Sequence, residues 1–524
     1  MADYNNKVLL LILDGWGLST VDYGNAPFLA NTPTLDYIYS TYPKTSLMAS
    51  GLEVGLSPGE AGNSEIGHLN IGTGRVVWED LPRITHAISS GEFFENPALV
   101  QALDNASNHN SSLHLIGLVS DGGVHSHISH LLAILKAASD RHIDQVFLHF
   151  VSDGRDTLPK QAETFINEVE QAFAQYRVGK IATIVGRLFA MDRDNNLDRT
   201  DRAFSLFVNN VGQSFSTATQ AILSGYQYDK NDETMEPAVI GQGATITDND
   251  SVIFFNFRND RMRQLSDMFL SSNNIERVPK NLFITTMTQY APNQTAPTLF
   301  APISLVNPLA AVIANTNLSQ LHIAETDKYP HITYYFNGRS EQVFPNERDF
   351  LIPTKQVESF DLYPLMSAPE ISNAVVAGIG AGFDFIVANF ANGDAVGHTG
   401  TLPAAIKACE GVDTLLQKIL AAASAAGYRV LLTADHGNCE SMIDELTKES
   451  NKNHTINPVP FIYFDFVTKP FDFKPTVFSK EDFFQYASGT PIGVLADIAP
   501  SILANLNLPQ PEDMSGMDLT VAMR

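Results

Sequence analysis

Carboxylate and imidazole side chains recur in this sequence where strand-like apolar runs end in polar loops. Asp394 and His398 are four residues apart, a spacing that places both side chains on one side of a helical turn. Oxygen and imidazole ligands without thiolate suit Mn²⁺, Zn²⁺ or Mg²⁺. One such residue on its own is typical of a turn or a cap, but their recurrence at strand ends favours a metal centre. The six candidate ligands are Asp14, Asp394, His398, Asp435, His436 and His454.

Ser64 lies in the segment AGNSEIGHLN, in a turn between two glycines. A serine at such a turn is commonly the N-cap of a helix. It can instead be a nucleophile, provided that a base or a metal ion activates its hydroxyl group. Two metal ions need roughly seven or eight ligands, and Ser64 would add one to the six above. The two readings are compatible, because N–H groups at a helix start would face an incoming phosphate.

Arginines gather in a second region of the chain, where they follow strand-like runs instead of decorating amphipathic helices. Most arginines in proteins are solvated surface charges. Arginine is also the preferred group for bidentate binding of phosphate or carboxylate, so a convergent set in an acidic chain predicts a small, doubly anionic substrate. A metal site at His125, His127 and His130 is the less favoured alternative, since no carboxylate partner there has a better claim. The arginines in question are Arg155, Arg187, Arg193, Arg258 and Arg261.

Seven continuous apolar runs predict the strands that position these residues. Runs of this length suit strands buried on both faces, as in parallel sheets. Helical patterns lie between several of them, most clearly over residues 403–427, where Gly427 occupies the place of a C-terminal cap. Alternating strands and helices indicate α/β architecture, with ligands at the carboxyl ends of the strands. The runs are VLLLIL, LHLIGLV, VFLHFV, IATIVG, VIFFNF, FDFIVANF and RVLLT.

Size and composition restrict the class of protein. A chain of 524 residues exceeds one core, and 44% hydrophobic with 17% charged residues is typical of a globular protein. The net charge of −25 argues against nucleic acid or an anionic membrane as partner. No apolar run reaches the roughly 18 residues of a membrane span, and VLLLIL near the N-terminus predicts a buried strand, not a signal peptide. Cys409 and Cys439 give no disulfide framework, which fits a reducing cytoplasm.

Two stretches have the composition of connections between domains. One lies around residues 77–82, and the other, at residues 291–308, contains four prolines and two asparagines. The segment between them has its own run of strands. We therefore expect one domain at residues 1–77 and 306–524, interrupted by an inserted domain at residues 78–305.

A set of motifs in a fixed order identifies a family resemblance. Over nearly its whole length the chain resembles the cofactor-independent phosphoglycerate mutases of the alkaline phosphatase superfamily. No single motif is specific, but the whole set is. The motifs are DGWG at 14–17, GNSEIGHLNIGTGR at 62–75, SDGGVHSH at 120–127, DGRDT at 153–157, MDRD at 191–194, NFRNDR at 256–261, ETDKYPH at 325–331, GDAVGHTG at 393–400, TADHGNCE at 433–440 and HTINPVPF at 454–461.

The resemblance implies a fold and a site. The fold would be an alkaline-phosphatase-like domain with a central, mostly parallel sheet, interrupted by an inserted α/β phosphotransferase domain. One metal ion would be held by Asp394, His398 and His454, and a second by Asp14, Ser64, Asp435 and His436. Mn²⁺ is favoured over Mg²⁺, Co²⁺ or Zn²⁺. Ser64 would be the nucleophile, with Asp156 and Lys328 as further catalytic residues. The residues around the substrate would be His125, Arg155, Asp156, Arg187, Arg193, Arg258, Arg261 and Lys328.

The resemblance also implies an activity. The protein would be an isomerase that interconverts 3-phosphoglycerate and 2-phosphoglycerate in glycolysis and gluconeogenesis, through a phosphoserine and without 2,3-bisphosphoglycerate. It would act as a cytoplasmic monomer, with no nucleic acid or membrane partner. The first alternative is another phosphatase, phosphodiesterase or sugar-phosphate mutase of the superfamily, which the metal ligands do not exclude. The second is a binding protein without activity, for which loss of the serine or of a ligand would be the signature; none is missing.

Overall fold

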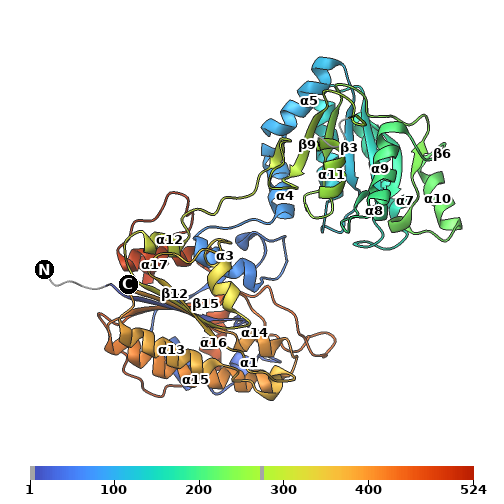
Figure 1. Ribbon diagram of the computed structural model, residues 1–524. Coiled ribbons are helices and arrows are strands. Elements are labelled where there is room, and N and C mark those ends of the chain that lie inside the picture. The colour runs from blue at the N-terminus through green and yellow to red at the C-terminus, as the bar shows by residue number, and fades with distance from the viewer. Residues whose placement is uncertain (1–5, 272–275, 524) are drawn as a thin grey trace. The chain divides into compact units, whose positions relative to one another are not determined.

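The computed structural model describes residues 6–271 and 276–523. The chain divides into two compact units, Met1–Trp78 with Ser304–Arg524 (the first unit) and Glu79–Ile303 (the inserted unit). Each unit is built around an eight-stranded sheet (Figure 1). The predicted α/β class with mostly parallel sheets is confirmed. In the described part of the chain, no helix combines the length and the apolar character that crossing a membrane requires.

The sheet of the first unit has five neighbouring parallel strands at its centre and one side. The central strand β1 (Val8–Leu13) is buried at every residue, as expected for a strand covered on both faces. β15 runs antiparallel to both of its neighbours and so closes the parallel region. In order across the sheet, the strands are β12 (Glu347–Ile352), β11 (Gln320–Glu325), β13 (Phe385–Phe390), β1, β14 (Arg429–Thr433), β15 (Val459–Asp465), β2 (Lys44–Met48) and β16 (Gly493–Val494).

Helices cover both faces of this sheet. α13 (Ala368–Ala381) and α15 (Leu402–Ala425) lie on one face, and α3 (Ser64–Thr73), α12 (Leu309–Ala314) and α17 (Ile498–Leu506) lie on the other (Figure 1). The helix predicted at residues 403–427 is α15, and Gly427 has a φ of 69° just beyond its end. The remaining helices are α1 (Ala26–Leu29), α2 (Pro33–Thr41), α14 (Asn392–Gly397) and α16 (Lys480–Ala487).

The inserted unit repeats the same architecture. Its strands are parallel except where β5 meets β7. Two hydrophobic clusters pack against the sheet, one from α4 to α7 with α10 and one from α8, α9 and α11. In order across the sheet, the strands are β10 (Thr298–Phe300), β9 (Phe283–Thr288), β8 (Ser251–Phe254), β3 (Leu113–Leu118), β4 (Val146–Ser152), β5 (Lys180–Gly186), β7 (Ala238–Ile240) and β6 (Gln213–Phe215).

The helices of the inserted unit fill the connections between these strands. They are α4 (Asp80–Ser90), α5 (Pro97–His109), α6 (Ile128–Asp140), α7 (Ala162–Tyr176), α8 (Arg187–Ala190), α9 (Leu197–Asn209), α10 (Ala218–Gln227) and α11 (Arg263–Leu270). All seven strands predicted from apolar runs are present, as β1, β3, β4, β5, β8, β13 and β14.

Candidate functional site

Ser64 is the first residue of α3, and its neighbour caps the helix. The Asn63 side chain accepts a hydrogen bond from the Ile66 N–H over 2.9 Å, so the interpretation of Ser64 as the N-cap is wrong. The Ser64 hydroxyl is therefore free of capping and lies 2.9 Å from His436 Nε2 and 3.3 Å from Asp14 Oδ1. Asp14 directly follows β1 and His436 lies just beyond β14, so parallel strands bring both side chains to the same edge of the sheet.

Lys328 follows β11 and completes the surroundings of Ser64. Its ammonium group donates to Ser64 Oγ over 2.7 Å and lies 2.9 Å from Asp14 Oδ1 and 2.6 Å from Asp394 Oδ2. Only 4% of Lys328 is exposed. Burial lowers the pKa of this amine, but the carboxylates of Asp14, Asp394 and Asp435 outweigh burial and raise it above its ordinary value. Lys328 is therefore a fixed positive charge beside the serine.

Asp394, His398 and His454 converge on one point next to this lysine. His398 Nε2 lies 2.9 Å from His454 Nε2, and both nitrogens approach Asp394 Oδ1, at 3.2 and 3.1 Å. His398 directly follows α14 (Asn392–Gly397), and His454 comes from a loop more than fifty residues later. Three donors of this kind within 4.8 Å of one another form a group that can hold a metal ion.

The outer hydrogen bonds of the two histidines test whether this group fits a metal ion. His398 Nδ1 lies 2.7 Å from the Lys452 carbonyl oxygen, and His454 Nδ1 lies 2.8 Å from the Gly62 carbonyl oxygen. A carbonyl accepts only, so each Nδ1 carries a proton, and a ring without a second proton presents the lone pair of its Nε2. Two lone pairs and a carboxylate then face one another, an arrangement that a cation stabilises. The residues fit a divalent metal ion.

A second donor set surrounds Ser64. His436 Nε2 lies 3.4 Å from Asp435 Oδ2 and 3.6 Å from Asp14 Oδ1. All of these side chains are buried. Burial raises the pKa of Asp14, and the neighbouring carboxylate of Asp435 raises it further. Carboxylates packed this closely need positive charge, so this set also fits a divalent ion.

Two further residues complete this set, and the sequence analysis did not single them out. His68 Nδ1 lies 3.3 Å from Asp435 Oδ2 and 2.9 Å from the Ser64 carbonyl oxygen. Asn389, in β13, donates to Asp14 Oδ2 over 2.8 Å. His68 is four residues after Ser64, the spacing that puts two helical side chains on one face, so the sequence contained a signal for it. Asn389 lies inside an apolar run and gave no such signal.

Glycines allow the backbone segments of the site to approach closely. Gly15 has a φ of 74°, and a Cβ atom on it would lie 2.6 Å from the Asp394 backbone nitrogen. A Cβ atom on Gly67 would lie 2.7 Å from the Asp435 carbonyl oxygen. Larger residues at either position would push apart the loops that carry the candidate ligands.

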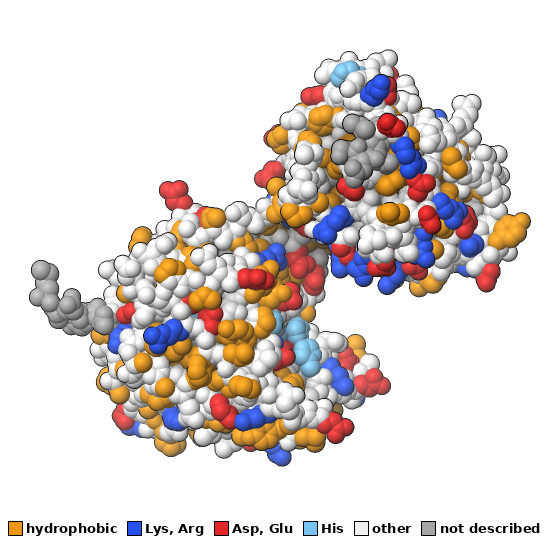
Figure 2. All heavy atoms as spheres, in the orientation of Figure 1, with side chains coloured by type: hydrophobic (Ala, Val, Ile, Leu, Met, Phe, Trp, Pro, Cys, Tyr) orange, Lys and Arg blue, Asp and Glu red, His pale blue; other side chains and the backbone are white. Residues whose placement is uncertain are grey.

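A cluster of charged side chains occupies the carboxyl ends of β3, β4, β5 and β8 in the inserted unit. Figure 2 shows Lys and Arg side chains gathered along one edge of this unit. Arg187 is buried, and its guanidinium group lies 2.6 Å from both Asp153 Oδ1 and Asp156 Oδ2. Burial lowers the pKa of Arg261, and the positive charges of Arg193, Arg187 and Arg155 lower it further. Mutual repulsion of this kind marks a place that an anion would stabilise.

His125 and Asp260 link the remaining arginines of this cluster. Asp260 lies 2.8 Å from Arg193 Nη1, 3.2 Å from Arg258 Nε and 3.8 Å from His125 Nδ1. Burial, followed by the charge of Arg187, lowers the pKa of His125 to about 4, so the ring is neutral near pH 7. The sequence analysis passed over Asp153 and Asp260, although both lie inside quoted motifs.

The structure thus sorts the predicted residues into two groups. The first unit holds Lys328 together with Ser64 and the candidate metal ligands, and Figure 2 shows histidine side chains at the surface of this unit. The inserted unit holds His125, Asp156 and the arginines. The alternative metal site at His125, His127 and His130 has no support, because His127 bonds Ser129 and His130 bonds Thr85.

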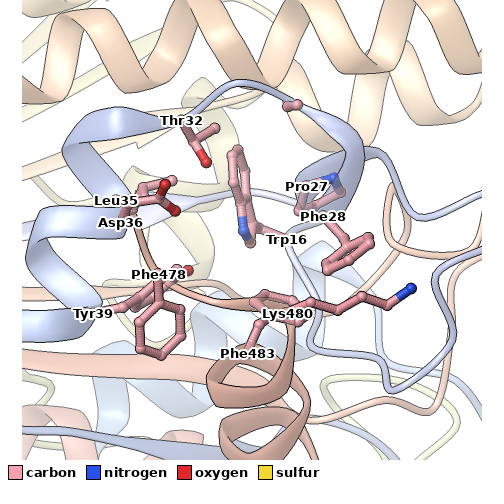
Figure 3. A pocket seen from close by; sticks show the side chains of 11 residues that line it. Trp16, Pro27, Phe28, Thr32, Leu35, Asp36, Tyr39, Phe478, Lys480 and Phe483 are labelled. Atoms are coloured by element: carbon pink, nitrogen blue, oxygen red, sulfur yellow. The ribbon is translucent and has the colours of Figure 1, made fainter. Parts of the chain in front are cut away.

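The loop that carries Asp14 also borders an aromatic cavity. Trp16, two residues further on, lines a hollow of about 210 Å³ (Figure 3). Five of its eleven lining residues are aromatic, and Asp36 and Lys480 are the charged members. None of the candidate metal ligands lines this cavity.

A protein-family model matches the inserted unit and indicates the class of this chain. Residues 84–292 match the family model described as the BPG-independent PGAM N-terminus. The 2,3-bisphosphoglycerate-independent phosphoglycerate mutase of Pseudomonas putida is 43% identical over 99% of this chain and 100% of that protein. The protein of the same name from Chloroflexus aurantiacus is 44% identical over 98% of both chains.

A solved structure agrees with these relatives. The phosphoglycerate mutase of Leishmania mexicana, studied at low cobalt concentration, shares 28% sequence identity over 98% of this chain and 97% of that chain, with a TM-score of 0.52. The chain belongs to the 2,3-bisphosphoglycerate-independent phosphoglycerate mutase family, a family of isomerases. The resemblance inferred from the motifs is confirmed.

Proposed function

We propose that this protein interconverts 3-phosphoglycerate and 2-phosphoglycerate through a phosphoserine on Ser64, with two divalent metal ions and without 2,3-bisphosphoglycerate. One observation carries the proposal. Ser64 Oγ lies at a helix start within 3.3 Å of a carboxylate, an imidazole and an ammonium group, on Asp14, His436 and Lys328. A serine hydroxyl needs such surroundings to become a nucleophile.

The first unit, with boundaries expected at residues 1–77 and 306–524, is the phosphatase-like metal-binding domain in this proposal. Asp394, His398 and His454 would hold one ion, and Asp14, Ser64, Asp435 and His436 the other. Divalent ions bound there would withdraw charge from phosphate oxygens and favour the deprotonated serine. Donors of nitrogen and oxygen suit Mn²⁺, and the name of the Leishmania mexicana structure mentions cobalt.

Lys328 would neutralise negative charge next to Ser64 Oγ. Phosphoryl transfer depends mainly on alignment and charge neutralisation. The ammonium group, already within 2.7 Å of Ser64 Oγ, is placed to hold a phosphate oxygen while the phosphoryl group moves to and from the serine.

The inserted unit, expected at residues 78–305, is the phosphotransferase and substrate-binding domain. Transfer to the serine leaves glycerate, which must stay bound and present its other hydroxyl group. The arginine cluster would bind the carboxylate of glycerate and prevent glycerate from leaving, with His125 as a neutral hydrogen-bonding group. Its members are Arg155, Arg187, Arg193, Arg258 and Arg261. A simple phosphatase has no need to retain the dephosphorylated acid.

Asp156 is the proposed proton carrier for the two hydroxyl groups of glycerate. Its Oδ2 accepts a hydrogen bond from Arg187 over 2.6 Å, which orients the carboxylate within the arginine cluster. A general base must lie within hydrogen-bond reach of the proton that it takes. In this role Asp156 takes the proton from one hydroxyl group as that oxygen attacks the phosphoserine.

The cellular setting belongs to the same proposal. We place the enzyme in glycolysis and gluconeogenesis, as a cytoplasmic monomer. Both cysteines are free and buried, which fits a reducing compartment, and the charge of −25 disfavours nucleic acid and anionic membranes.

The decisive assay supplies 3-phosphoglycerate and Mn²⁺ without 2,3-bisphosphoglycerate. We expect 2-phosphoglycerate as the product and, after acid quenching, phosphate on Ser64. Release of inorganic phosphate without 2-phosphoglycerate would identify a phosphatase of the same superfamily instead.

A further inference from the structure

The carboxylate group of Glu440 accepts four hydrogen bonds in the interior of the first unit. Glu440 is the last residue of the motif TADHGNCE and is 1% exposed. Its Oε2 accepts hydrogen bonds from the N–H groups of Gly17 and Asn438, over 3.1 and 2.8 Å. Its Oε1 accepts hydrogen bonds from the Thr455 hydroxyl group and from Asn457 Nδ2, the latter over 2.9 Å. The proposed reaction assigns no role to this carboxylate.

The four donors come from three loops, and each of these loops also carries a candidate metal ligand. One loop follows β1, the second follows β14, and the third precedes β15. In each loop a donor lies one to three residues after the ligand, so a shift of the donor moves the ligand with it. The pairs of ligand and donor are Asp14 with Gly17, His436 with Asn438, and His454 with Thr455.

Asn438 extends this connection to Asp394. The N–H group of Asn438, which donates to Glu440, also donates to the Gly15 carbonyl oxygen over 3.0 Å. The Asn438 side chain donates from Nδ2 to Asp394 Oδ1 over 3.0 Å. This is the carboxylate oxygen that two histidines of the candidate metal group approach. Glu440 is therefore connected with the proposed sites of both ions.

The carboxylate of Glu440 also fills the space between these loops. A Cβ atom on Gly17 would lie 2.3 Å from Glu440 Cδ, and a Cβ atom on Gly437 would lie 2.4 Å from Glu440 Oε1. The two loops thus approach the carboxylate so closely that only glycine fits at these positions. Loss of the carboxylate would leave two buried N–H groups short of an acceptor, which favours movement of the loops.

We propose that Glu440 is a positioning residue for both divalent ions, and that it holds the three loops in the geometry in which their ligands bind metal. The inference rests on the proposed function, because it concerns the two ions assigned there to Ser64 and its neighbours. Glu440 itself is no ligand, since both of its oxygens accept hydrogen bonds from the protein. Groups that orient metal ligands from outside typically change metal affinity about ten- to a hundredfold when they are removed.

The test measures the affinity of the full chain for Mn²⁺. Metal-free protein is titrated with Mn²⁺, and the free ion is followed by its electron paramagnetic resonance signal. Glu440→Met removes both acceptors at nearly the same side-chain length, so the dissociation constants of both ions should rise about ten- to a hundredfold. Glu445→Met, the control, removes an exposed carboxylate nearby in the chain and should change neither constant. Unaltered constants in folded Glu440→Met would overturn the proposal.

Glu440→Gln separates position from charge. The new amide oxygen can accept hydrogen bonds from the two N–H groups, and the amide nitrogen can donate to the Thr455 hydroxyl oxygen. The loops should therefore keep their places, and both dissociation constants should remain close to those of the unchanged chain. A loss of affinity as large as that in Glu440→Met would show that the charge matters instead, and would overturn the positioning role.

The same titration distinguishes this inference from the proposed function. If the unchanged chain binds two ions and folded Glu440→Met binds them equally well, only the positioning role is refuted. If the unchanged chain does not bind two ions, the proposed function is refuted and the inference with it. Should Glu440→Met fail to fold, Thr455→Val removes one donor beside His454. It should weaken only the ion that His398→Gln also weakens, by about tenfold, and unaltered affinity for that ion would overturn the proposal.

Discussion

The ammonium group of Lys328 donates a hydrogen bond to Ser64 Oγ over 2.7 Å, although 264 residues separate the two in sequence. The same ammonium group contacts the carboxylates of Asp14 and Asp394. Ser64 therefore lies where carboxylates at the ends of two central strands share one buried cation. This arrangement gives a hydroxyl group both a nearby acceptor for its proton and a nearby positive charge for a phosphate.

Replacement of the nucleophile tests the central assignment. Ser64→Ala should lower mutase turnover by at least about a thousandfold, because no neighbouring hydroxyl can accept the phosphoryl group in its place. The fold should persist, since Asn63 and not Ser64 caps α3. Coupled measurement of 2-phosphoglycerate formation gives the rate, and circular dichroism gives the fold. Ser40→Ala, an exposed change on α2, should retain full activity; turnover near normal in Ser64→Ala would refute the nucleophile.

Much of the sheet architecture could be predicted because central parallel strands are apolar on both faces. β1 and β13 each show six buried residues in a row and could be recognised from composition alone. Edge strands lack this signal. β12 has the sequence ERDFLI, in which only the first and last residues are buried, and its charged residues gave no continuous run. The strand could therefore be found only from its pairing with β11.

The site could be predicted where the ligand follows a strand, and less well where a ligand lies within one. Asp14 and Asp435 come directly after β1 and close after β14, so their position indicated their role. Asn389 lies inside β13 and reads as one polar residue in an apolar strand. Local sequence also could not choose between Asn63 and Ser64 as the cap, because both residue types cap helices well.

Removal of Lys328 should reveal its electrostatic role in the ion-free protein. Lys328→Met leaves the buried carboxylates of Asp14 and Asp394 without their shared cation, at a cost of about 3 to 5 kcal/mol in the free energy of unfolding. Mn²⁺ should restore much of this stability, because the ion supplies the missing positive charge. Urea unfolding of the metal-free and Mn²⁺-loaded forms measures both effects. Equal stability of Lys328→Met and the unchanged chain without metal would contradict this account.

Chelation tests the two donor sets around Ser64. Activity should disappear in excess EDTA and return on addition of Mn²⁺. The reason is that Asp394, His398 and His454 form a group that can bind a metal ion, and the proposed reaction depends on that ion. Elemental analysis must show that the ions have left. Full activity of protein shown to be ion-free would remove the metal requirement.

A variant of one candidate ligand tests whether the group at Asp394 binds the ion that activity requires. His398→Gln should raise the Mn²⁺ concentration for half-maximal activity by about ten- to a hundredfold, since one donor of the group is lost. His109→Gln, an exposed change on α5 in the inserted unit, should leave that concentration unaltered.

The arginine cluster should control retention of glycerate. Arg261→Met removes a guanidinium group that lies among other positive charges. An anion bound at such a place is stabilised most strongly. We expect the KM for 3-phosphoglycerate to rise about tenfold or more, and a larger share of turnovers to end in inorganic phosphate. Arg141→Met is the control, because Arg141 pairs with Asp104 outside the cluster. An unchanged KM and product ratio in Arg261→Met would exclude this residue from the substrate site.

Buried histidines should make the inserted unit sensitive to acid. Burial lowers the pKa of His130 to about 3, with a further contribution from His127. In the unfolded chain His130 is therefore protonated below about pH 6.5, whereas in the folded chain it is protonated only below about pH 3. Stability from this residue is present above pH 6.5 and is lost as the pH falls, by up to about 3 kcal/mol at pH 4. His130→Gln should flatten this loss in urea unfolding between pH 8 and pH 4. His86→Gln, an exposed change on α4, should leave the pH dependence as it is, and an equally steep loss in His130→Gln would show that other groups cause it.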